Sequence, residues 1–419
     1  MPRQLRAPVV VMLGLVTTVC REPSTAPTPI THLPRTLSAS ETRLVSVSNR
    51  FAFTLLREVA RQTRDTLPNL FISPLSVTMA LGMTYNGAAG TTEAAMRQTL
   101  ALDPMTTPEV NEAFHGLIDL LRGLDPRVRF QVANSIWYRQ GFTVEPAFLD
   151  VNRTAYDARV EGLDFGSPAA PQRINDWVST ETQGRITRIV PTPLPSDAVM
   201  YLINAIYFKG DWTRQFDRAR TRPEPFHLSD GTAVSVPTMS TDKPASILTY
   251  SDGTVQVADL PYGGRAFSMM VVMPRDSSAL DSLVQGLTAE QWNGWVAGLD
   301  SASLDVSLPK FTLTNDLLLN SMLTALGMGI AFDCDPPEMA DFTRMHVPQE
   351  VCITTVKHKT FVDVNEEGTE AGAATAVGIG LTSVPQPIVV DRPFLFAIRE
   401  NLSGTILFLG MITNPAQLP

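Results

Sequence analysis

The stretch from Val364 to Pro387 constrains the fold of this chain more than any other. Its sequence, VNEEGTEAGAATAVGIGLTSVPQP, is acidic at first and then consists largely of Gly, Ala, Thr and small aliphatic residues. No proline lies between Pro348 and Pro385, although the chain contains 32 prolines and loops usually collect such turn-forming residues. Proline is the residue that a central β-strand excludes. We therefore interpret this stretch as a loop that can later become a strand.

Side-chain size along this stretch fits insertion into a packed sheet. On alternate positions, one face of such a strand carries Thr369, Ala371, Ala373, Thr375 and Val377. All five are small or β-branched and none is charged, so burying this face would leave no unpaired charge. Glu370 falls on the other face, which can stay in water. The composition taken by itself also fits a flexible surface loop.

The segment before this loop, Val351 to Val364, is predicted to be a half-buried strand because its residue types alternate. One face carries Val356, His358, Thr360, Val362 and Val364, and the other carries Lys357, Lys359 and Asp363. The strand leads directly into the small-residue loop. A strand, a hinge and a returning segment together provide the geometry that hairpin insertion requires.

Elsewhere the pattern indicates helices in the first part of the chain and antiparallel strands in the later part, which favours an α+β fold. Apolar spacing predicts a helix over 45–62, and Ser73-Pro74 is typical of an N-cap followed by the first residue of a helix. A further helix is expected at Leu317–Leu326, ended by Gly327. Strands are expected at 69–72, 131–138, 198–208, 254–260, 266–273 and 303–309. With no internal repeat, we expect one domain over 41–415.

Charge and motifs argue against several classes of function. The net charge of −9 comes without basic runs, so nucleic acid and an anionic membrane surface are unfavourable partners. The motif S-x-x-K occurs twice, at Ser240–Lys243 and Ser307–Lys310, but its companion K-T-G is absent. No hydrolase, zinc-protease or phosphate-loop motif is present, and the five His lack ligand spacing. We expect a protein that is not an enzyme and needs no metal or cofactor.

The amino terminus has the features of an export signal. Residues 1–19 combine Arg3 and Arg6 with an apolar run too short to cross a bilayer, as in a signal peptide. Cys20 follows, and residues 20–40 form a Pro/Thr/Ser-rich linker that we expect to be a flexible tether. This arrangement resembles a bacterial lipoprotein signal with Cys20 as the lipidation site, although Val19 and Thr17 depart from that pattern. Simple secretion is the alternative.

The two other cysteines, Cys334 and Cys352, show no metal-binding spacing. Two buried thiols are the default interpretation, and one disulfide would form in an oxidising compartment. The sequence leaves both states open.

Two segments of the chain resemble the serpin family of serine protease inhibitors. Residues Glu366 to Ala371, followed by Gly-Ala-Ala-Thr-Ala, are similar to the reactive-loop hinge, and Ile388 to Ile398 is similar to the C-terminal signature. The interval between them fits a serpin reactive loop without insertion or deletion. Further similar stretches begin at Ile174 (INDWVSTETQGRI), Gln256 (QVADLPYGGRAFSMMVVMP) and Leu308 (LPKFTL). The resemblance implies three β-sheets, eight or nine helices, an exposed reactive loop and suicide inhibition without a catalytic group of its own.

The resemblance also implies roles for individual residues. The reactive bond would join Thr382 to Ser383, and Trp212 would lie at the breach, where insertion begins. The shutter beneath the parting strands would comprise Ser73, Ser76, Asn204 and His358. The hinge would comprise Glu366, Glu367, Gly368, Thr369, Glu370, Ala371, Gly372, Ala373, Ala374, Thr375 and Ala376. Gly372 and Gly378 depart mildly from the family pattern, and glycine weakens a strand.

Thr382 at the specificity position favours a serine protease with a small or apolar pocket, of the elastase or subtilisin kind. A shift of one residue would place Leu381 there and favour a chymotrypsin-like target. We expect an exported monomer, secreted or held at the cell surface or in the periplasm, with a membrane contact only through a lipid on Cys20. The alternative within the family is a non-inhibitory binding protein on the same fold.

Overall fold

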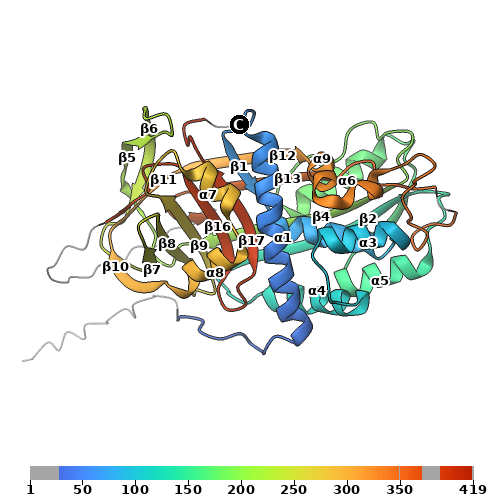
Figure 1. Cartoon of the computed structure of the whole chain (residues 1–419), viewed down its shortest axis with the longest axis horizontal. Helices are drawn as coiled ribbons and strands as arrows, with labels where there is room; N and C mark the ends of the chain where they lie inside the picture. The colour runs from blue at the N-terminus through green and yellow to red at the C-terminus, as the bar shows by residue number, and fades with distance from the viewer. Residues whose placement is uncertain (1–27, 349, 370–386, 418–419) are drawn as a thin grey trace, which may run out of the picture.

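The structure is a computed structural model that describes residues 28–348, 350–369 and 387–417. Across these ranges the chain forms nine α-helices and three β-sheets, which confirms the predicted fold class (Figure 1). A π-helical turn, η1 (Thr324–Met328), and a 3-10 turn, η2 (Gly329–Phe332), follow the last helix. The helices are α1 (Ala39–Thr63), α2 (Pro74–Tyr85), α3 (Gly90–Thr99), α4 (Thr107–Leu121), α5 (Pro146–Tyr156), α6 (Ala169–Glu181), α7 (Leu280–Gly286), α8 (Ala289–Ala297) and α9 (Asn320–Leu323).

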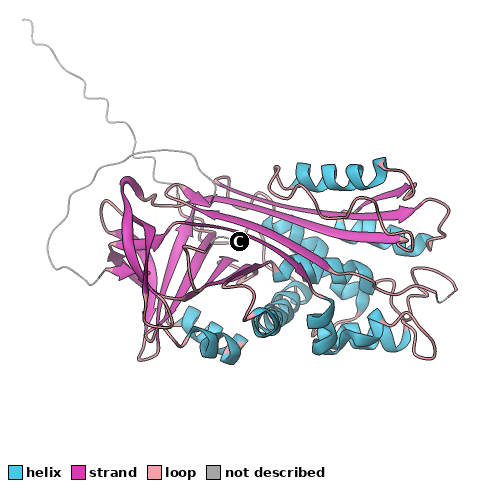
Figure 2. Cartoon of the chain, turned by 90° about the horizontal axis from the view of Figure 1, so that it is seen from above, coloured by secondary structure: helices cyan, strands magenta, loops and turns pink. Residues whose placement is uncertain are grey.

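The longest strands belong to a six-stranded sheet whose order is β12-β13-β14-β4-β2-β3. All neighbours in it are antiparallel except β2 and β3. Helix α6 packs its apolar residues Ile174 and Val178 with Trp137 and Ile203 of this sheet, so it covers one face (Figure 2). The strands are β12 (Phe311–Leu318), β13 (Lys357–Val364), β14 (Gly368–Thr369), β4 (Met200–Asp211), β2 (Val128–Arg139) and β3 (Arg159–Leu163).

Two further sheets complete the molecule. The seven-stranded sheet contains β9 and β16, all of whose residues are buried. Its strands, in order, are β1 (Asn69–Ile72), β17 (Ile406–Ile412), β16 (Phe394–Glu400), β9 (Phe267–Pro274), β8 (Val255–Tyr262), β7 (Ala245–Ser251) and β10 (Asp300–Leu304). The four-stranded sheet has the order β15 (Ile388–Val389), β11 (Val306–Pro309), β6 (Ala233–Ser240) and β5 (Asp217–His227).

Local sequence explains where the first helices begin. Ser73 is the N-cap of α2 and its hydroxyl accepts the N–H of Ser76, while Pro74 occupies the first helical position. Ser38 and Glu41 form a capping box at the start of α1. The linker expected over 20–40 overlaps α1, which begins at Ala39, and Ile30 and Arg35 before this helix are bonded to the domain. There Ile30 N–H donates to Gly264 O at 2.7 Å, and Arg35 pairs with Glu41 at 2.6 Å.

Three expected elements differ from the structure. The strand expected over 303–309 is two strands, because the chain passes at Asp305 from the seven-stranded sheet into the four-stranded one. The helix expected at Leu317–Leu326 is wrong at its start, since Leu317 and Leu318 continue the alternating burial of β12. The strand expected from Val351 begins only at Lys357.

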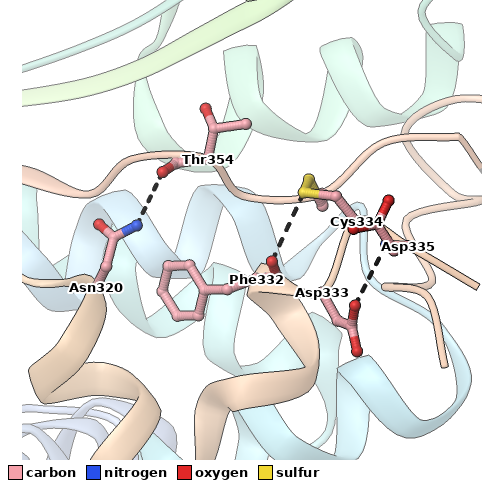
Figure 3. Close-up of a disulfide and its surroundings, with 7 residues drawn as sticks. Asn320, Phe332, Asp333, Cys334, Asp335 and Thr354 are labelled. Carbon is pink, nitrogen blue, oxygen red and sulfur yellow. Dashed lines mark hydrogen bonds between the residues drawn. A yellow bond between two sulfur atoms is a disulfide. The ribbon is translucent and has the colours of Figure 1, made fainter.

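Cys334 and Cys352, which the sequence leaves undecided, form a disulfide (Figure 3). Their Cα atoms are 5.2 Å apart and the two residues are separated by 18 positions in the sequence. Both lie in the connection between η2 and β13. The default interpretation of two buried thiols is therefore wrong.

Candidate functional site

The hinge residues Gly368 and Thr369 form the two-residue strand β14 between β13 and β4. Thr369 stands opposite Val364 of β13 and Gly210 of β4, in antiparallel register with both. Along the described chain, β13 and β4 are neighbours only through β14. We call the boundary between β13 and β4 the seam; β14 occupies only one end of it.

Beyond Thr369 the seam continues as a narrow cleft. Its walls come from the two strands that β14 separates, and the segment after α6 closes one side. Arg185 belongs to this covering segment, and its guanidinium lies 4.8 Å from the centre of the Phe361 ring on β13. The cleft is lined by Thr182, Arg185, Ile186, Ile206, Tyr207, Phe208, Phe361, Val362, Asp363 and Thr369.

A buried tyrosine holds the side chain of Thr369. The hydroxyl of Tyr262 and Thr369 Oγ1 are 2.8 Å apart and hydrogen-bonded. The Tyr262 ring stacks on Trp212, with centroids 4.4 Å apart and an angle of 12° between the rings. Burial raises the pKa of Tyr262, so its phenol stays protonated and neutral. Sequence patterns did not identify Tyr262, because a tyrosine that ends a strand carries no local signal of what it contacts.

Trp212, predicted to mark the breach, holds the turn that leads into β14. Its indole Nε1–H donates to Asn365 O at 2.9 Å, and its backbone N–H donates to Glu367 O at 2.9 Å. Gly368 approaches β4 so closely that a Cβ on it would lie 2.2 Å from Gly210 O. Only glycine fits this position, because any side chain would collide with backbone rather than with a movable side chain.

The two acidic residues before β14 are buried and paired. Glu366 accepts from Lys310 Nζ at 3.0 Å and from Thr221 Oγ1 at 2.8 Å. Burial raises the pKa of Glu366, but these bonds and a backbone N–H outweigh it and hold the pKa below its ordinary value. Glu367 forms an ion pair with Arg218. Lys310, Thr221 and Arg218 thus fix the acidic start of the hinge.

The predicted shutter residues divide into two groups. Ser73 N–H donates to His358 Nε2 at 2.9 Å, and Ser73 Oγ donates to Leu407 O at 2.8 Å. Burial lowers the pKa of His358 from the ordinary 6.5 to about 4, so the ring is neutral at pH 7 and accepts this bond. Ser76 joins through its backbone N–H, which donates to Ser73 Oγ.

Asn204 forms the second group, on the other side of the seam. Its Nδ2 donates to Asn134 Oδ1 at 2.7 Å, while its Oδ1 is buried without a hydrogen-bond partner among the described residues. Val364 of β13 and Gly210 of β4 both stand opposite Thr369, so they lie at the same level of the sheet. His358 precedes Val364 by as many residues as Asn204 precedes Gly210. The two therefore stand opposite each other across the part of the seam that no described strand occupies.

Two shutter neighbours were missed by sequence reasoning. Phe71 of β1 donates its N–H to Asn315 Oδ1 and accepts from Thr360 Oγ1, both at 2.6 Å. Asn315 and Thr360 are polar residues on buried faces of β12 and β13. That burial, visible as polar residues at the apolar positions of an alternating pattern, is the signal that could have identified them.

Several predicted residues lie outside the described ranges. These are the signal peptide 1–19, Cys20, the hinge from Glu370 to Ala376, Leu381 and the reactive bond Thr382–Ser383. Within the described ranges no cluster of metal-binding side chains occurs and no helix has the length and apolarity to cross a membrane. The two S-x-x-K serines, Ser240 and Ser307, hydrogen-bond each other at 2.9 Å. Lys310 of the second motif is bound to Glu366.

Comparison with known proteins agrees with this geometry. A family model described as Serpin (serine protease inhibitor) matches residues 46–415. The leukocyte elastase inhibitor of Sus scrofa is 34% identical over 385 residues, covering 89% of this chain and 100% of that protein. The native crystal structure of Tengpin, a thermophilic serpin, aligns with a TM-score of 0.80 at 27% identity, over 93% of this chain and 97% of that one.

Human thyroxine-binding globulin in complex with thyroxine aligns equally well, with a TM-score of 0.80 at 27% identity, over 90% of this chain and 100% of that one. The similar proteins therefore include one named for inhibiting a protease and one named for binding a small molecule. The three sheets, the hinge between β13 and β4 and these similarities lead to one conclusion: the chain belongs to the serpin family.

Proposed function

We propose that this protein inhibits serine proteases by suicide-substrate trapping. The protease serine attacks the carbonyl carbon of Thr382, and the peptide bond to Ser383 breaks to leave an acyl-enzyme. Ser383 becomes a new amino terminus. The segment before Thr382 then enters the seam as a central strand and carries the bound protease with it. The inhibitor contributes no catalytic group, because the change of fold supplies the driving free energy.

The observation that carries this proposal is β14 itself. Thr369 already pairs with both β13 and β4, and Gly368 pairs with β4. The two strands have no other link along the described chain. The cleft below Thr369 continues between the same strands. A strand that extends β14 would therefore lie between β13 and β4, which do not pair with each other along the described chain.

Extending the register of β14 gives a specific contact for the inserted form. Thr375 would stand opposite both His358 of β13 and Asn204 of β4. Thr375 follows Thr369 by as many residues as His358 precedes Val364 and Asn204 precedes Gly210, and the strand runs antiparallel to both. A Thr375 hydroxyl could then donate to the buried Asn204 Oδ1, which has no partner among the described residues. The small residues at alternate positions would face the core without a clash.

The distances and free energies suit this mechanism. About fifteen inserted residues at roughly 3.3 Å each would move the protease by about 50 Å. About 1 kcal/mol for each new backbone hydrogen bond would supply on the order of 10 kcal/mol. We infer that deacylation fails because this movement pulls the active site of the protease out of shape.

The target is inferred from the bait residues. Thr382 suits a shallow pocket of the elastase or subtilisin kind, whereas Leu381 would suit a chymotrypsin-like enzyme. The similarity to a leukocyte elastase inhibitor supports a target of the first kind. We propose that the protein acts as a monomer, because one chain supplies both the bait and the seam.

We also propose that the protein is exported. The disulfide between Cys334 and Cys352 supports an oxidising compartment, as residues 1–19 do by resembling a signal peptide. Mass spectrometry of the mature amino terminus will distinguish a lipid on Cys20 from simple secretion.

The decisive experiment mixes the purified protein with an elastase-, a subtilisin- and a chymotrypsin-like protease. We expect a complex that survives denaturing electrophoresis and a released fragment that begins at Ser383. A fragment that begins at Thr382 would instead identify Leu381 as the specificity residue. Cleavage without a complex for all three proteases would contradict inhibition and favour a binding protein of the kind that thyroxine-binding globulin exemplifies.

Thr369→Arg and Thr369→Ser form a matched pair for this experiment. Arginine would place a charge beside Tyr262 in a buried site, so we expect the variant to be cleaved as a substrate with at least about a tenfold loss of complex. Serine keeps the hydroxyl and the small size, and we expect it to trap protease like the wild type. Equal trapping by both variants would contradict insertion.

A further inference from the structure

We propose that the Cys334–Cys352 disulfide closes a clasp across the far end of the seam, and that reducing it lets β13 and β4 part more readily. The clasp comprises the residues of the disulfide ring that the structure describes, 334–348 and 350–352. The proposal concerns control of the same insertion site, so its inhibitory consequence rests on the proposed function. The restraint itself is a property of the uncleaved fold.

One end of the clasp is fixed next to β13. Cys352 lies shortly before this strand. The next residue, Ile353, donates its backbone N–H to Ala331 O at 2.9 Å. Asn320 Nδ2 donates to Thr354 O at 2.8 Å in the same segment (Figure 3). The disulfide adds a covalent link from this segment to Cys334, directly after η2.

The other end of the clasp holds the segment that follows β2. Glu145 N–H donates to Met345 O at 2.9 Å, and His346 Nδ1 lies 2.6 Å from Thr143 O. The rings of Phe142 and His346 stack with centroids 4.2 Å apart. Since β2 pairs along its length with β4, this end of the clasp is attached to the opposite side of the seam from β13.

The clasp lies at the end of the seam opposite to β14. The hinge pairs with Val364, the last residue of β13, and with Gly210 and Asp211 at the end of β4. Cys352 instead precedes the first residue of β13, and Phe142 follows the last residue of β2, Arg139, which lies at that same far end. The hinge thus closes one end of the seam, and the clasp bridges the other.

Under this proposal, parting of β13 and β4 at this end requires Met345 and His346 to leave residues 142–145. A ring closed by cysteines 18 positions apart gains much less chain entropy on such local opening than the uncross-linked segment does. Loop-entropy estimates for a ring of this size give a factor on the order of 100 in the opening equilibrium. The oxidised clasp therefore opposes premature insertion.

Reduction is chemically accessible, because Cys334 is exposed. A dithiol attacks one sulfur, the Sγ–Sγ bond breaks, and the second thiol of the reductant displaces the mixed disulfide. Two electrons and two protons pass to the protein, which is left with two thiols, and the reductant is left as its own disulfide. A secreted dithiol oxidoreductase could supply this chemistry, and dithiothreitol is the laboratory probe.

Hydrogen exchange of the full, uncleaved chain tests the clasp. Cys334→Ala/Cys352→Ala and dithiothreitol-treated wild type are compared with untreated wild type and with Cys20→Ala, which removes the remaining cysteine. We expect amides at 142–145 and 353–360 to exchange at least about tenfold faster in the first two samples. Those at 208–212 and 365–369, at the hinge end, should stay within about twofold.

Unchanged exchange at 142–145, or equal acceleration at both ends of the seam, would overturn the clasp. Peptide mapping without reductant must also find the 334–352 link, and its absence from correctly exported protein would likewise overturn the proposal. Because hydrogen exchange needs no protease, a protein that shows the expected exchange but traps no protease would contradict only the proposed function.

Discussion

At the scale of single residues, the hydroxyl of Tyr262 is the group through which the core holds the hinge. We predict that Tyr262→Phe keeps the stacking on Trp212 but leaves Thr369 Oγ1 buried without this bond. The loss should cost about 1–2 kcal/mol, so exchange of the hinge amides at 368–369 should accelerate by about fivefold to thirtyfold. Hydrogen exchange measures this directly, and denaturant unfolding should show a decrease of similar size.

Tyr250→Phe is the matched control, since Tyr250 also donates its hydroxyl to a nearby acceptor, Asp252, at 3.0 Å but has no hydrogen bond to the described hinge residues. It should change unfolding by less than about 0.5 kcal/mol and leave hinge exchange unchanged. Equal effects of the two substitutions would mean that Tyr262 has no special role in holding β14.

The residue scale is also where sequence reasoning reached its limit. The acidic start of the hinge was visible, but Lys310, Thr221 and Arg218, which bind Glu366 and Glu367, come from distant strands and linkers. Pairing of Cys334 with Cys352 was undecidable for the same reason. Spacing along a chain does not fix distance in space unless a local element imposes it.

At the scale of elements, prediction succeeded where periodicity dictates structure. The alternation of His358, Thr360, Val362 and Val364 predicted the buried face of β13, and the structure confirms it. Ser73-Pro74 likewise predicted the start of α2. The helix expected at Leu317 failed because a short apolar run fits both periods, and pairing with β13 decided in favour of the strand.

The same elements predict a pH effect. His358 of β13 joins the six-stranded sheet to the start of α2 by accepting from Ser73 N–H, which only the neutral ring can do. Because its pKa is near 4 in the folded protein and 6.5 ordinarily, the unfolded chain binds the proton first as pH falls. The contribution of His358 to the free energy of unfolding is complete above about pH 6.5 and decreases as the pH falls from 6.5 to 4. At pH 4.5 the loss is about 2–3 kcal/mol.

Comparison with His358→Gln isolates this effect, since glutamine can accept from Ser73 but does not titrate. Denaturant unfolding at pH 7 and pH 4.5 should show a larger acid loss for the wild type by about 2–3 kcal/mol. If both proteins lose equal stability on acidification, the buried neutral histidine is not the cause.

At the scale of the whole molecule, the described fold has one seam that a strand could fill and holds it at both ends. β14 closes the hinge end through Tyr262, Trp212 and two buried carboxylates, and residues 334–352 bridge the other. Among the described residues β13 and β4 do not pair with each other, and under the proposed mechanism a strand inserted between them would lower the free energy. The uncleaved form would then be a kinetically trapped state, maintained by the barrier to parting the strands.

Cleavage in the reactive loop should therefore make the protein more heat-stable. Insertion would pair β13 and β4 along their length and release on the order of 10 kcal/mol, enough to raise the unfolding midpoint by more than about 10 °C. Differential scanning calorimetry before and after cleavage at Thr382–Ser383 measures the shift. Cleaved Thr369→Arg should keep the midpoint of its uncleaved form, because its hinge cannot enter the core. A wild-type midpoint unmoved by cleavage would mean that the seam is not filled, and that β14 anchors the hinge instead of starting its insertion.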